Sequence, residues 1–425
     1  MITMVSCLNK NYYVCTGCAL LCDDIEVEVS GDHITEIKTA CRKGFSRIRG
    51  CIEPMPCIVN GKNVDIDTAI KDAASILKNS DKPLIFGLGN STSEAQKQAI
   101  KLAKRINAFI DDTSSFCQSP TLEAILHGKI RTCTLDDVRN RADVIVYWGA
   151  DPSNSHPRHL SRYSYFPRGE ERQRGWEEDR TAIAIDVRKS HTAKICGDKF
   201  FQIPLHADAV FIDALIDALS GKVPNVSFEY DIKKILKLAN VLKKAQFGII
   251  FEGVGIDYII EDMGAMTRLM GKLNEVSKFH LIPMVEHYNM RGFNQNLFEE
   301  TGFLNRVKFK KSEKGFDVKY GVDYSIMEVL NTKKIDAALI IGSDPMSYLP
   351  RSAAEYLLEI PLVSIGPCEN FTSRVAKVTI PSALSGVECG GSAVRMDGVK
   401  VTFEPIIKTA RLSDEEILKR VIEAI

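Results

Sequence analysis

Six short apolar runs, each ending in Gly, Asp, Ser or Pro, constrain the fold of this chain more than any other feature. They are KPLIFGLGNS, ADVIVYWGADP, RTAIAIDVRKS, QFGIIFEGVG, DAALIIGSDP and IPLVSIGPCEN. Continuous apolar runs of this length are typical of parallel strands that are buried on both faces. The segment DTAIKDAASILKNS, just before the first run, has apolar positions at helical spacing. The alternation of helix and strand predicts an α/β fold with parallel sheets.

Two of the strand ends are nearly the same, Gly149-Ala150-Asp151-Pro152 and Gly342-Ser343-Asp344-Pro345. This repetition suggests two related α/β halves. Strand ends of this kind present backbone N–H groups and helix N-termini, which bind anions. A nucleotide diphosphate could therefore lie across the carboxyl edges of both halves, although such ends also occur in α/β proteins in general.

The N-terminal region, residues 1–58, contains seven of the twelve cysteines. Cys15, Cys18 and Cys22 lie in one short loop, and Cys41 follows the alternating stretch DDIEVEVSGDHITEIK, which predicts a hairpin. Four thiolates at this spacing fit a [4Fe–4S] cluster. Structural zinc is the alternative, but zinc sites more often use two separated pairs of ligands. The region is thus predicted to be a small, metal-supported subdomain.

Two further segments carry residue types with catalytic chemistry. Cys117 lies in the polar stretch DDTSSFCQSPT, where Pro120 and Thr121 can begin a helix, and the dipole at a helix N-terminus favours a thiolate. A lone cysteine is by default a small buried apolar residue. His287 and Arg291 lie in EHYNMRGFNQN, and Arg291 could bind a carboxylate or could be an ordinary surface arginine.

Composition excludes some classes of function. The 55 basic and 55 acidic side chains cancel, so the charge gives no support to nucleic-acid binding. No apolar run reaches the roughly 18 residues of a membrane helix, and the N-terminus has no signal-peptide pattern, so we expect a cytoplasmic protein. The charged run RGEERQRGWEEDR at 168–180 is interpreted as a solvated excursion, with a partner-docking loop as the alternative.

Together these segments resemble the molybdopterin oxidoreductase superfamily, and within it the B-subunit family of archaeal tungsten- or molybdenum-dependent formylmethanofuran dehydrogenases. The resemblance covers nearly the whole chain and rests on its motifs and their order. These motifs are CTGCALLC with ACRKG, SSFCQSPT, NRADVIVYWGADPSNSHPRHLSRYSYFPRG, IDVRKSHTA, NMRGFNQ and VTIPSALSGVECGGSAVRMDGV.

The resemblance implies a catalytic subunit that reduces CO2 to formate, in methanogenesis, at a tungsten or molybdenum bis(pyranopterin guanine dinucleotide) centre fed by one [4Fe–4S] cluster. It implies Cys15, Cys18, Cys22 and Cys41 as cluster ligands and Cys117 as the ligand of tungsten or molybdenum.

For the remaining site residues, the resemblance implies Lys43 between cluster and pterin, and Arg291 as the residue that holds CO2 or formate. The family pattern has a histidine after the metal-binding cysteine, where this chain has Gln118. Glutamine cannot shuttle a proton near neutral pH. Either His287 or a water chain delivers the proton, or this position has no proton-relay role in this branch; an inactive subunit is the third alternative, against which the intact four-cysteine motif argues. Reasonable pterin contacts follow the buried strands: Gly149, Asp151, Asp186, Arg188, Gly342, Asp344 and the 381–395 loop.

The implied architecture is an iron–sulfur subdomain at 1–58, which residues 381–425 could rejoin, and two α/β pterin-binding domains at 59–137 with 286–380 and at 138–285. The C-terminal barrel of the superfamily is missing, so a separate D subunit is expected to cover the pterins. The other implied partners are an amidohydrolase-like A subunit, the C subunit, and ferredoxin or polyferredoxin subunits. Two alternatives stay open, a formate dehydrogenase and a non-catalytic iron–sulfur electron-transfer protein.

Overall fold

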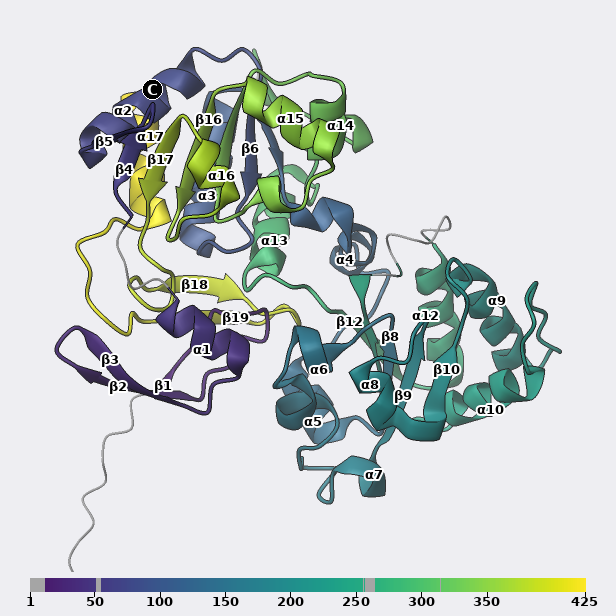
Figure 1. Ribbon diagram of the computed structural model, residues 1–425. Coiled ribbons are helices and arrows are strands. Elements are labelled where there is room, and N and C mark those ends of the chain that lie inside the picture. Colours follow the sequence, from purple (N-terminus) through teal and green to yellow (C-terminus); the bar gives the residue numbers. More distant parts are fainter. Residues whose placement is uncertain (1–11, 51–54, 255, 257–263, 314) are drawn as a thin grey trace, which may run out of the picture.

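The protein is built on two parallel-stranded sheets that lie in separate bodies, joined by a third, smaller unit (Figure 1). The computed structural model describes residues 12–50, 55–254, 256, 264–313 and 315–425. The observed parallel sheets confirm that part of the predicted fold class. How the sheets divide the chain into domains stays a prediction. No helix in the described ranges has the length and apolar character needed to cross a membrane.

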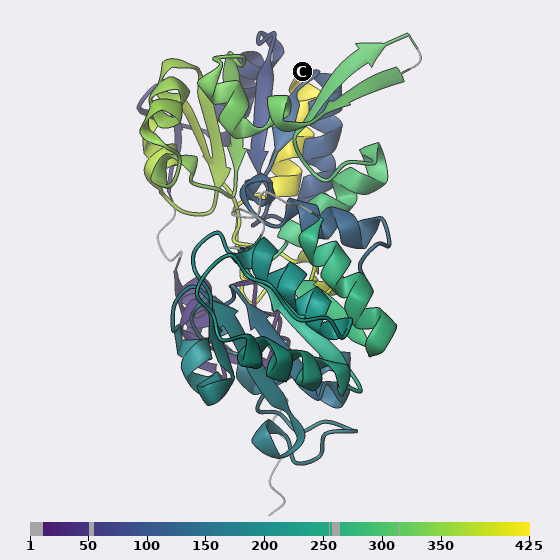
Figure 2. The same ribbon diagram turned by 90° about the vertical axis from the view of Figure 1, so that its right-hand side faces the viewer.

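The larger body holds a nine-stranded sheet of order β14-β13-β7-β6-β15-β16-β17-β4-β5, in which β7, β6, β15, β16 and β17 are parallel. Its strands are β4 (Cys57–Val59), β5 (Lys62–Val64), β6 (Pro83–Gly87), β7 (Phe109–Asp111), β13 (Val307–Ser312), β14 (Gly315–Tyr320), β15 (Ala337–Ile341), β16 (Leu362–Gly366) and β17 (Val378–Pro381). The β13–β14 hairpin projects from one edge (Figure 2).

Helices cover both faces of this sheet. One face packs on α2 (Ile66–Lys78), α3 (Ser93–Arg105), α13 (Met290–Thr301) and α17 (Asp414–Ala424). The other packs on α14 (Ile326–Asn331) and α15 (Arg351–Glu359). The central strands β6, β15 and β16 are buried along their whole length, which explains why their sequences are continuously apolar rather than alternating.

The second body holds a five-stranded, fully parallel sheet of order β10-β9-β8-β11-β12. Its strands are β8 (Val144–Trp148), β9 (Thr181–Asp186), β10 (Phe200–Gln202), β11 (Gly248–Glu252) and β12 (Phe279–Pro283). One face packs on α9 (Asp208–Leu219), α10 (Ile232–Lys243) and α12 (Ala265–Val276). The other packs on α5 (Leu135–Arg141), on α8 (His191–Cys196) and on the N-terminal cysteine loop.

The two nearly identical strand ends make the same hydrogen bonds. Asp151 accepts from the backbone N–H and the hydroxyl of Thr192 at 3.1 and 2.7 Å. Asp344 accepts from the same two groups of Thr372 at 2.8 and 2.7 Å. In both bodies this carboxylate ties the turn after one strand to the helix after the next strand. The relationship between the two halves stays a prediction.

The N-terminal unit is a three-stranded antiparallel sheet of β1 (Tyr12–Tyr13), β2 (Ile25–Ser30) and β3 (His33–Lys38), followed by α1 (Arg42–Arg49). The predicted hairpin is confirmed, with Gly31 at a φ of 61° in its turn. Leu20, Ile25 and Val27 are at most 3% exposed and belong to the same apolar core as the five-stranded sheet.

The predicted fold class needs a correction at this unit. The described ranges contain no group of three or more His, Cys, Asp or Glu side chains that could hold a metal ion. Apolar packing against the second body holds this unit in place. The prediction of an iron–sulfur subdomain is therefore wrong.

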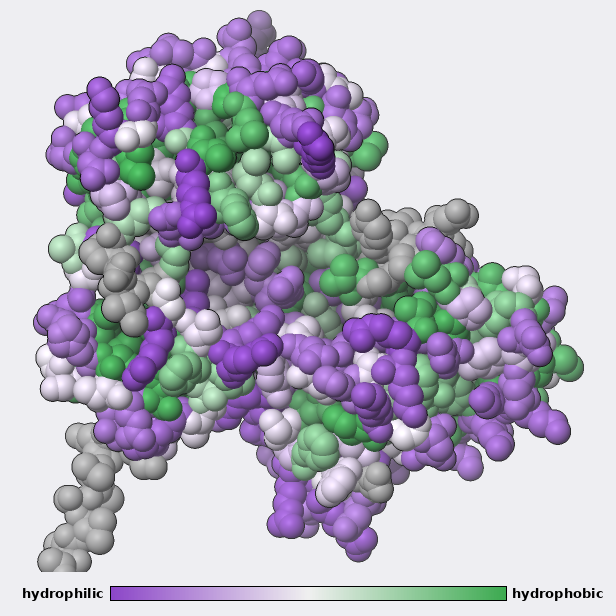
Figure 3. All heavy atoms as spheres, in the orientation of Figure 1, coloured by the Kyte–Doolittle hydropathy of each residue, from purple (hydrophilic) through white to green (hydrophobic). Residues whose placement is uncertain are grey.

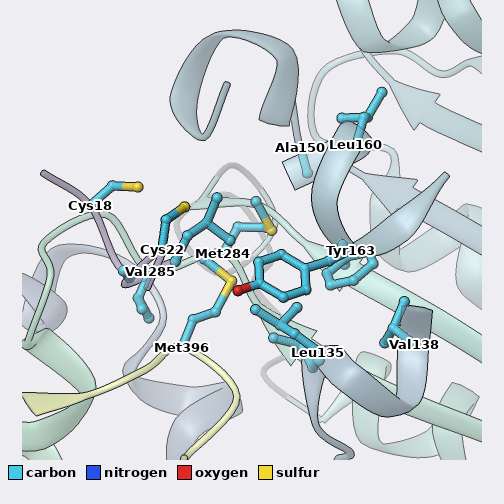
Figure 4. Close-up of a cluster of buried hydrophobic side chains, with 14 of the residues drawn as sticks. Cys18, Cys22, Leu135, Val138, Ala150, Leu160, Tyr163, Met284, Val285 and Met396 are labelled. Atoms are coloured by element: carbon cyan, nitrogen blue, oxygen red, sulfur yellow. The ribbon is translucent and has the colours of Figure 1, made fainter. Parts of the chain in front are cut away.

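A C-terminal hairpin of β18 (Gly391–Val394) and β19 (Lys400–Phe403) connects the three units. The turn between these strands places Arg395 and Asp397, at 6% and 5% exposure, as a bidentate ion pair with contacts of 2.9 and 2.7 Å. Asp397 also accepts from the Leu135 N–H of α5 at 2.6 Å. The N–H of Met396 donates to Ala19 of the cysteine loop at 3.1 Å. Figure 4 shows Met396 between Cys22, Tyr163 and Leu135.

Replacing Asp397 by alanine should lower the free energy of unfolding by about 2 kcal/mol or more, because the buried Arg395 guanidinium keeps only the half-exposed Asp136 as a partner and the Leu135 N–H loses its acceptor. Urea unfolding followed by circular dichroism measures the loss. Lys419→Ala, which breaks an exposed pair with Glu415 on α17, is the control and should cost less than about 1 kcal/mol. An equal loss of unfolding free energy in the two variants would contradict the stabilising role of the Arg395–Asp397 pair.

Candidate functional site

A pocket of about 610 Å³ lies between the nine-stranded sheet and the N-terminal unit. Figure 3 shows the surface hollowed between the upper and lower bodies. The lining comes from separate segments of the chain: α1, the loops after β6, β11, β15 and β16, the Cys117 loop, and the turn and first residue of α13. The residues used below are Arg47, Asn90, Phe116, Cys117, Gln118, Glu286, His287, Met290, Gly342, Asp344 and Tyr348.

Cys117 lies between a short 3-10 turn, Thr113–Phe116, and α4 (Ser119–Leu126). The predicted helix start is confirmed, with Pro120 in its first turn. The thiol is half-buried, and its sulfur lies 3.6 Å from the carbonyl oxygen of Thr113. Of the predicted catalytic residues, Cys117, Gln118 and His287 come together in this one pocket.

A buried polar network fixes the backbone on both sides of Cys117. Asn305 donates to the hydroxyls of Ser114 and Ser119, and Ser119 donates to the Ser114 carbonyl at 2.8 Å. Asn294, from α13, donates to Ser114 at 2.8 Å. All four side chains are at most 2% exposed. Because buried polar groups need partners, this network gives the loop a single conformation.

Two adjacent buried carboxyl groups lie at the start of the same loop. Burial raises the pKa of Asp111 to about 6, although it accepts from the N–H groups of Ile326 and Arg306 at 2.8 and 3.1 Å. Burial and then the charge of Asp111 raise the pKa of Asp112 to about 7. Asp112 accepts from Ser114, while its Oδ2 has no partner among the described residues. Asp112 therefore holds a proton through the mildly acidic range.

His287 enters the pocket from the turn before α13. Its Nδ1 lies 3.2 Å from the amide nitrogen of Asn90. Burial lowers the pKa of His287; Glu286 opposes this, while Lys43 and Arg47 lower it further. The ring is therefore neutral near pH 7. Lys43 lies on α1 with its Nζ 3.9 Å from Glu286, so the lysine is beside the pocket rather than in its lining.

Gln118 is fully buried at the floor of the pocket. Its amide nitrogen donates to the Glu252 carbonyl at 3.4 Å, and its Oε1 has no partner among the described residues. The side chain can therefore offer a hydrogen-bond acceptor to a bound group.

Arg291 is 4% exposed and follows Met290 of the pocket lining. Its Nε and Nη1 have no hydrogen-bond partner in the described part of the chain. Burial lowers the pKa of Arg291 to about 10, and the charge of Asp397 opposes this. An unpaired buried guanidinium is costly, and a bound anion would offset that cost. The guanidinium itself is not part of the lining.

The predicted contacts after the buried strands divide between two places. Gly342 and Asp344 line the pocket. Gly149, Asp151, Asp186 and Arg188 are at the carboxyl end of the five-stranded sheet, outside the lining. Arg188 is largely exposed and 3.7 Å from Asp151, and Asp186 accepts from the Arg188 N–H at 3.2 Å.

The four N-terminal cysteines also come together. Cys15, Cys18, Cys22 and Cys41 line a small enclosed cavity with Arg158. Burial raises the pKa of Cys18 and of Cys22 to about 12. The four cysteines therefore lie around one cavity, as predicted. Among the described residues, however, they do not form a group that could hold a metal ion.

Comparison with known proteins gives full-length relatives. The chain is 36% identical to the B subunit of the tungsten-containing formylmethanofuran dehydrogenase 2 of Methanocaldococcus jannaschii over 97% of both chains. It is 34% identical to the protein of the same name in Methanococcus maripaludis, over 97% of this chain and 98% of the other. The chain belongs to the B-subunit family of formylmethanofuran dehydrogenases. No family model matches it.

Family membership places this protein in the formylmethanofuran dehydrogenase complex, a multisubunit enzyme. A shorter match, 33% identity over 98 residues, is to the B subunit of the formyltransferase/hydrolase complex of Methylorubrum extorquens. The crystal structure of that complex with methylofuran contains a similar fold, with a TM-score of 0.68 and 21% identity over 86% of this chain and 98% of the other.

These findings correct the predicted superfamily, function and cofactors. A solved fold that this chain matches comes from a formyltransferase/hydrolase complex. The identification as the CO2-reducing catalytic subunit of that superfamily is wrong. The [4Fe–4S] cluster and the tungsten or molybdenum bis(pyranopterin guanine dinucleotide) are wrong with it, as are the alternatives built on the same reaction or cluster. Membership of the B-subunit family itself holds.

The names of two relatives include tungsten, so the residues present here must be tested against that metal. Cys117 offers one soft donor. A metal ion held by protein alone needs several donors, and the described ranges contain no suitable group of three. The side chains therefore do not form a tungsten site by themselves, and no step below depends on one.

Sequence reasoning missed Asp112, Asn294 and Asn305. The Asp111-Asp112 pair just before TSSFC was a usable signal, because adjacent carboxylates at the end of a buried strand are costly unless they have a role. Asn294 and Asn305 gave no signal, since their link to the Cys117 loop exists only in the folded chain.

Asp112→Asn should remove a pH dependence of stability. A carboxyl group with a raised pKa binds its proton more tightly in the folded state, so wild-type stability falls as pH rises from about 4 to about 7. The part of the loss that comes from Asp112 should be roughly 2 to 4 kcal/mol. Asp112→Asn should lack that part and keep the smaller loss that the raised pKa of Asp111 contributes. Urea unfolding at pH values from about 4.5 to about 8 measures this, with the exposed Asp67→Asn as control. If the free energies of unfolding of variant and wild type differ by the same amount at every pH, the raised pKa of Asp112 is contradicted.

Proposed function

We propose that this chain works as the B subunit of a formylmethanofuran dehydrogenase complex, and that the Cys117 pocket binds the formyl- or carboxylate-level one-carbon group on which the complex acts. The observation that carries the proposal is the convergence of Cys117, Gln118 and His287 in one pocket. The membership of the chain in the B-subunit family supports its place in such a complex.

Each group has a defined capacity. The Cys117 thiol is partly accessible and can act as a nucleophile or as a soft ligand once it is deprotonated. His287 is neutral near pH 7 and can accept a proton. Gln118 offers a free acceptor oxygen, which suits an N–H or O–H of a bound group. The buried polar network behind the loop keeps these groups in position.

Arg291 supplies the electrostatic part of the proposal. Its buried and unpaired N–H groups favour a negatively charged or polar group near the start of α13. Met290, the residue before Arg291, lines the pocket. A shift of Met290 would let an anionic group bound in the pocket also contact the Arg291 guanidinium. The expected partners are the remaining proteins of the complex: the amidohydrolase-like A subunit, the C and D subunits, and ferredoxin-type subunits.

Cys117→Ser in the co-expressed complex should reduce formylmethanofuran-dependent reduction of a viologen dye by at least about a hundredfold, with assembly intact. Cys196→Ala, which removes a buried thiol of α8, is the matched control and should leave the specific activity per assembled complex within about twofold. An active Cys117→Ser complex would refute the proposed role of the pocket.

Arg291→Met should separate stability from activity. Removing an unpaired buried charge should leave the free energy of unfolding unchanged or raise it by about 1 kcal/mol. The dye-linked activity of the assembled complex should fall by at least about tenfold. Arg420→Met, on the exposed side of α17, should change neither. A strongly destabilised Arg291→Met would show that the guanidinium is structural instead.

A further inference from the structure

His287 is held in the wall of the Cys117 pocket by the loop after β6. Gly89 of this loop lies directly against the histidine: a Cβ at position 89 would be 3.1 Å from both Cβ and Cδ2 of His287. The N–H of Asn289 donates to the Gly89 carbonyl at 3.0 Å, which ties the turn before α13 to the same loop. Leu88, next to Gly89, has a φ of 71°, a strained conformation that persists only where the surroundings fix it. The imidazole ring therefore has one orientation.

The side-chain amide of Asn90 lies between this ring and a backbone carbonyl. Its nitrogen is 3.1 Å from the Gly342 carbonyl oxygen and 3.2 Å from Nδ1 of His287. A carbonyl oxygen only accepts hydrogen bonds, so the NH2 side of the amide must face Gly342. The opposite orientation would place two acceptor oxygens against each other. One of the two N–H groups of Asn90 thus bonds Gly342, and the other is directed to His287.

This amide orientation fixes the position of the proton on the ring. A neutral imidazole has one nitrogen that donates and one that accepts. Because Asn90 donates to Nδ1, the proton of the neutral ring is on Nε2. The charged groups around the ring are Glu286 in its own turn and Lys43 and Arg47 on α1, and burial lowers the pKa of His287. The ring is therefore neutral near pH 7 with an Nε2–H.

Nε2 is the polar atom that the ring offers to the pocket. His287 is part of the pocket lining, and its Nδ1 is already occupied by Asn90. An Nε2–H donates to an oxygen, which suits the carbonyl or carboxylate oxygen of a one-carbon group. Uptake of a proton by the neutral ring takes place at Nδ1 and breaks the bond from Asn90. Donation at Nε2 costs no such bond.

We propose that Asn90 is a positioning residue that holds His287 as the Nε2–H tautomer, so that His287 donates a hydrogen bond to an oxygen of the one-carbon group. A donor that is already oriented needs no reorganisation when charge develops on that oxygen. Gln118 offers an acceptor at the floor of the same pocket, so the two side chains have complementary roles. This inference rests on the proposed function, because that function supplies the one-carbon group.

Nuclear magnetic resonance of the full chain, labelled with nitrogen-15 histidine, tests the tautomer. The chain has eight histidines, and His287→Gln identifies the signals of this ring. In the wild type, Nε2 should carry the proton from about pH 6 to about pH 8. In Asn90→Asp a carboxylate replaces the donor, so the neutral ring should move its proton to Nδ1 and its pKa should rise. Asn63→Asp, the same change at an exposed position of β5, should leave the ring as in the wild type.

The dye-linked activity of the assembled complex tests the role of the donor. In Asn90→Asp the imidazolium present at low pH keeps an Nε2–H, whereas the neutral ring presents an Nε2 lone pair to the pocket. The ratio of variant to wild-type activity should be at least about tenfold below one at about pH 8, and it should recover as the pH falls to about 6. A ratio that is the same at every pH would show that Asn90 is only structural, which overturns the proposal.

Two probes identify the class of oxygen. Sodium formate supplies a carboxylate and N-methylformamide supplies a formyl oxygen, and either is added to the labelled full chain. The probe that shifts the Nε2 signal of His287 names the class of group. A signal that neither probe shifts overturns the donor role.

The two proposals fail separately. A wild-type ring with its proton on Nδ1 refutes this inference and leaves the proposed function standing. An active Cys117→Ser complex refutes the proposed function and leaves the tautomer as the spectra define it.

Discussion

The buried ion pair of Arg395 and Asp397 is the interaction on which the arrangement of the three units depends. It lies in the turn between β18 and β19, far along the chain from its contacts in the second body, Leu135, Asp136 and Tyr163. Through Asp397 it caps α5 of the second body, and through the neighbouring Met396 it binds the cysteine loop. Arg395 also lies over the ring of Tyr163, 5.5 Å from its centre. The Arg395 guanidinium also donates to Asp136 of α5 at 3.1 Å, so both charges of the pair tie the turn to the second body.

The same hairpin also positions residues of the candidate site. Val394, just before the ion pair, donates its N–H to the side chain of Asn289 at 2.7 Å, and Asn289 precedes α13. The start of α13 carries Met290 and Arg291, while the turn before it carries His287. The position of the pocket residues from this turn is therefore linked to the packing of the C-terminal hairpin, and the Cys117 loop is held separately by Asn294 and Asn305.

The hydrogen bonds that Thr192 donates to Asp151, and that Thr372 donates to Asp344, change how the repeated strand ends are understood. Asp151 and Asp344 each follow a buried strand, and from this position alone both carboxylates would be expected to be available to a ligand. In the fold each of them accepts two hydrogen bonds from a threonine in the helix after the next strand, at 2.7 to 3.1 Å. The repeated motif is thus a structural device that both bodies use, and only the second copy also faces the Cys117 pocket.

The sequence by itself determined the parallel sheets, the N-terminal hairpin, the helix after Cys117 and the B-subunit family, because each depends on local periodicity or on a run of adjacent residues. It did not determine what the cysteine motif holds, and the superfamily, function and cofactors inferred from that resemblance were wrong. Only the tertiary structure decided that Cys117, Gln118 and His287 share a pocket, that Asn294 and Asn305 support it, and that Asn90 contacts the ring of His287. These facts depend on contacts between segments as much as 197 residues apart, and local sequence carries no record of such distances.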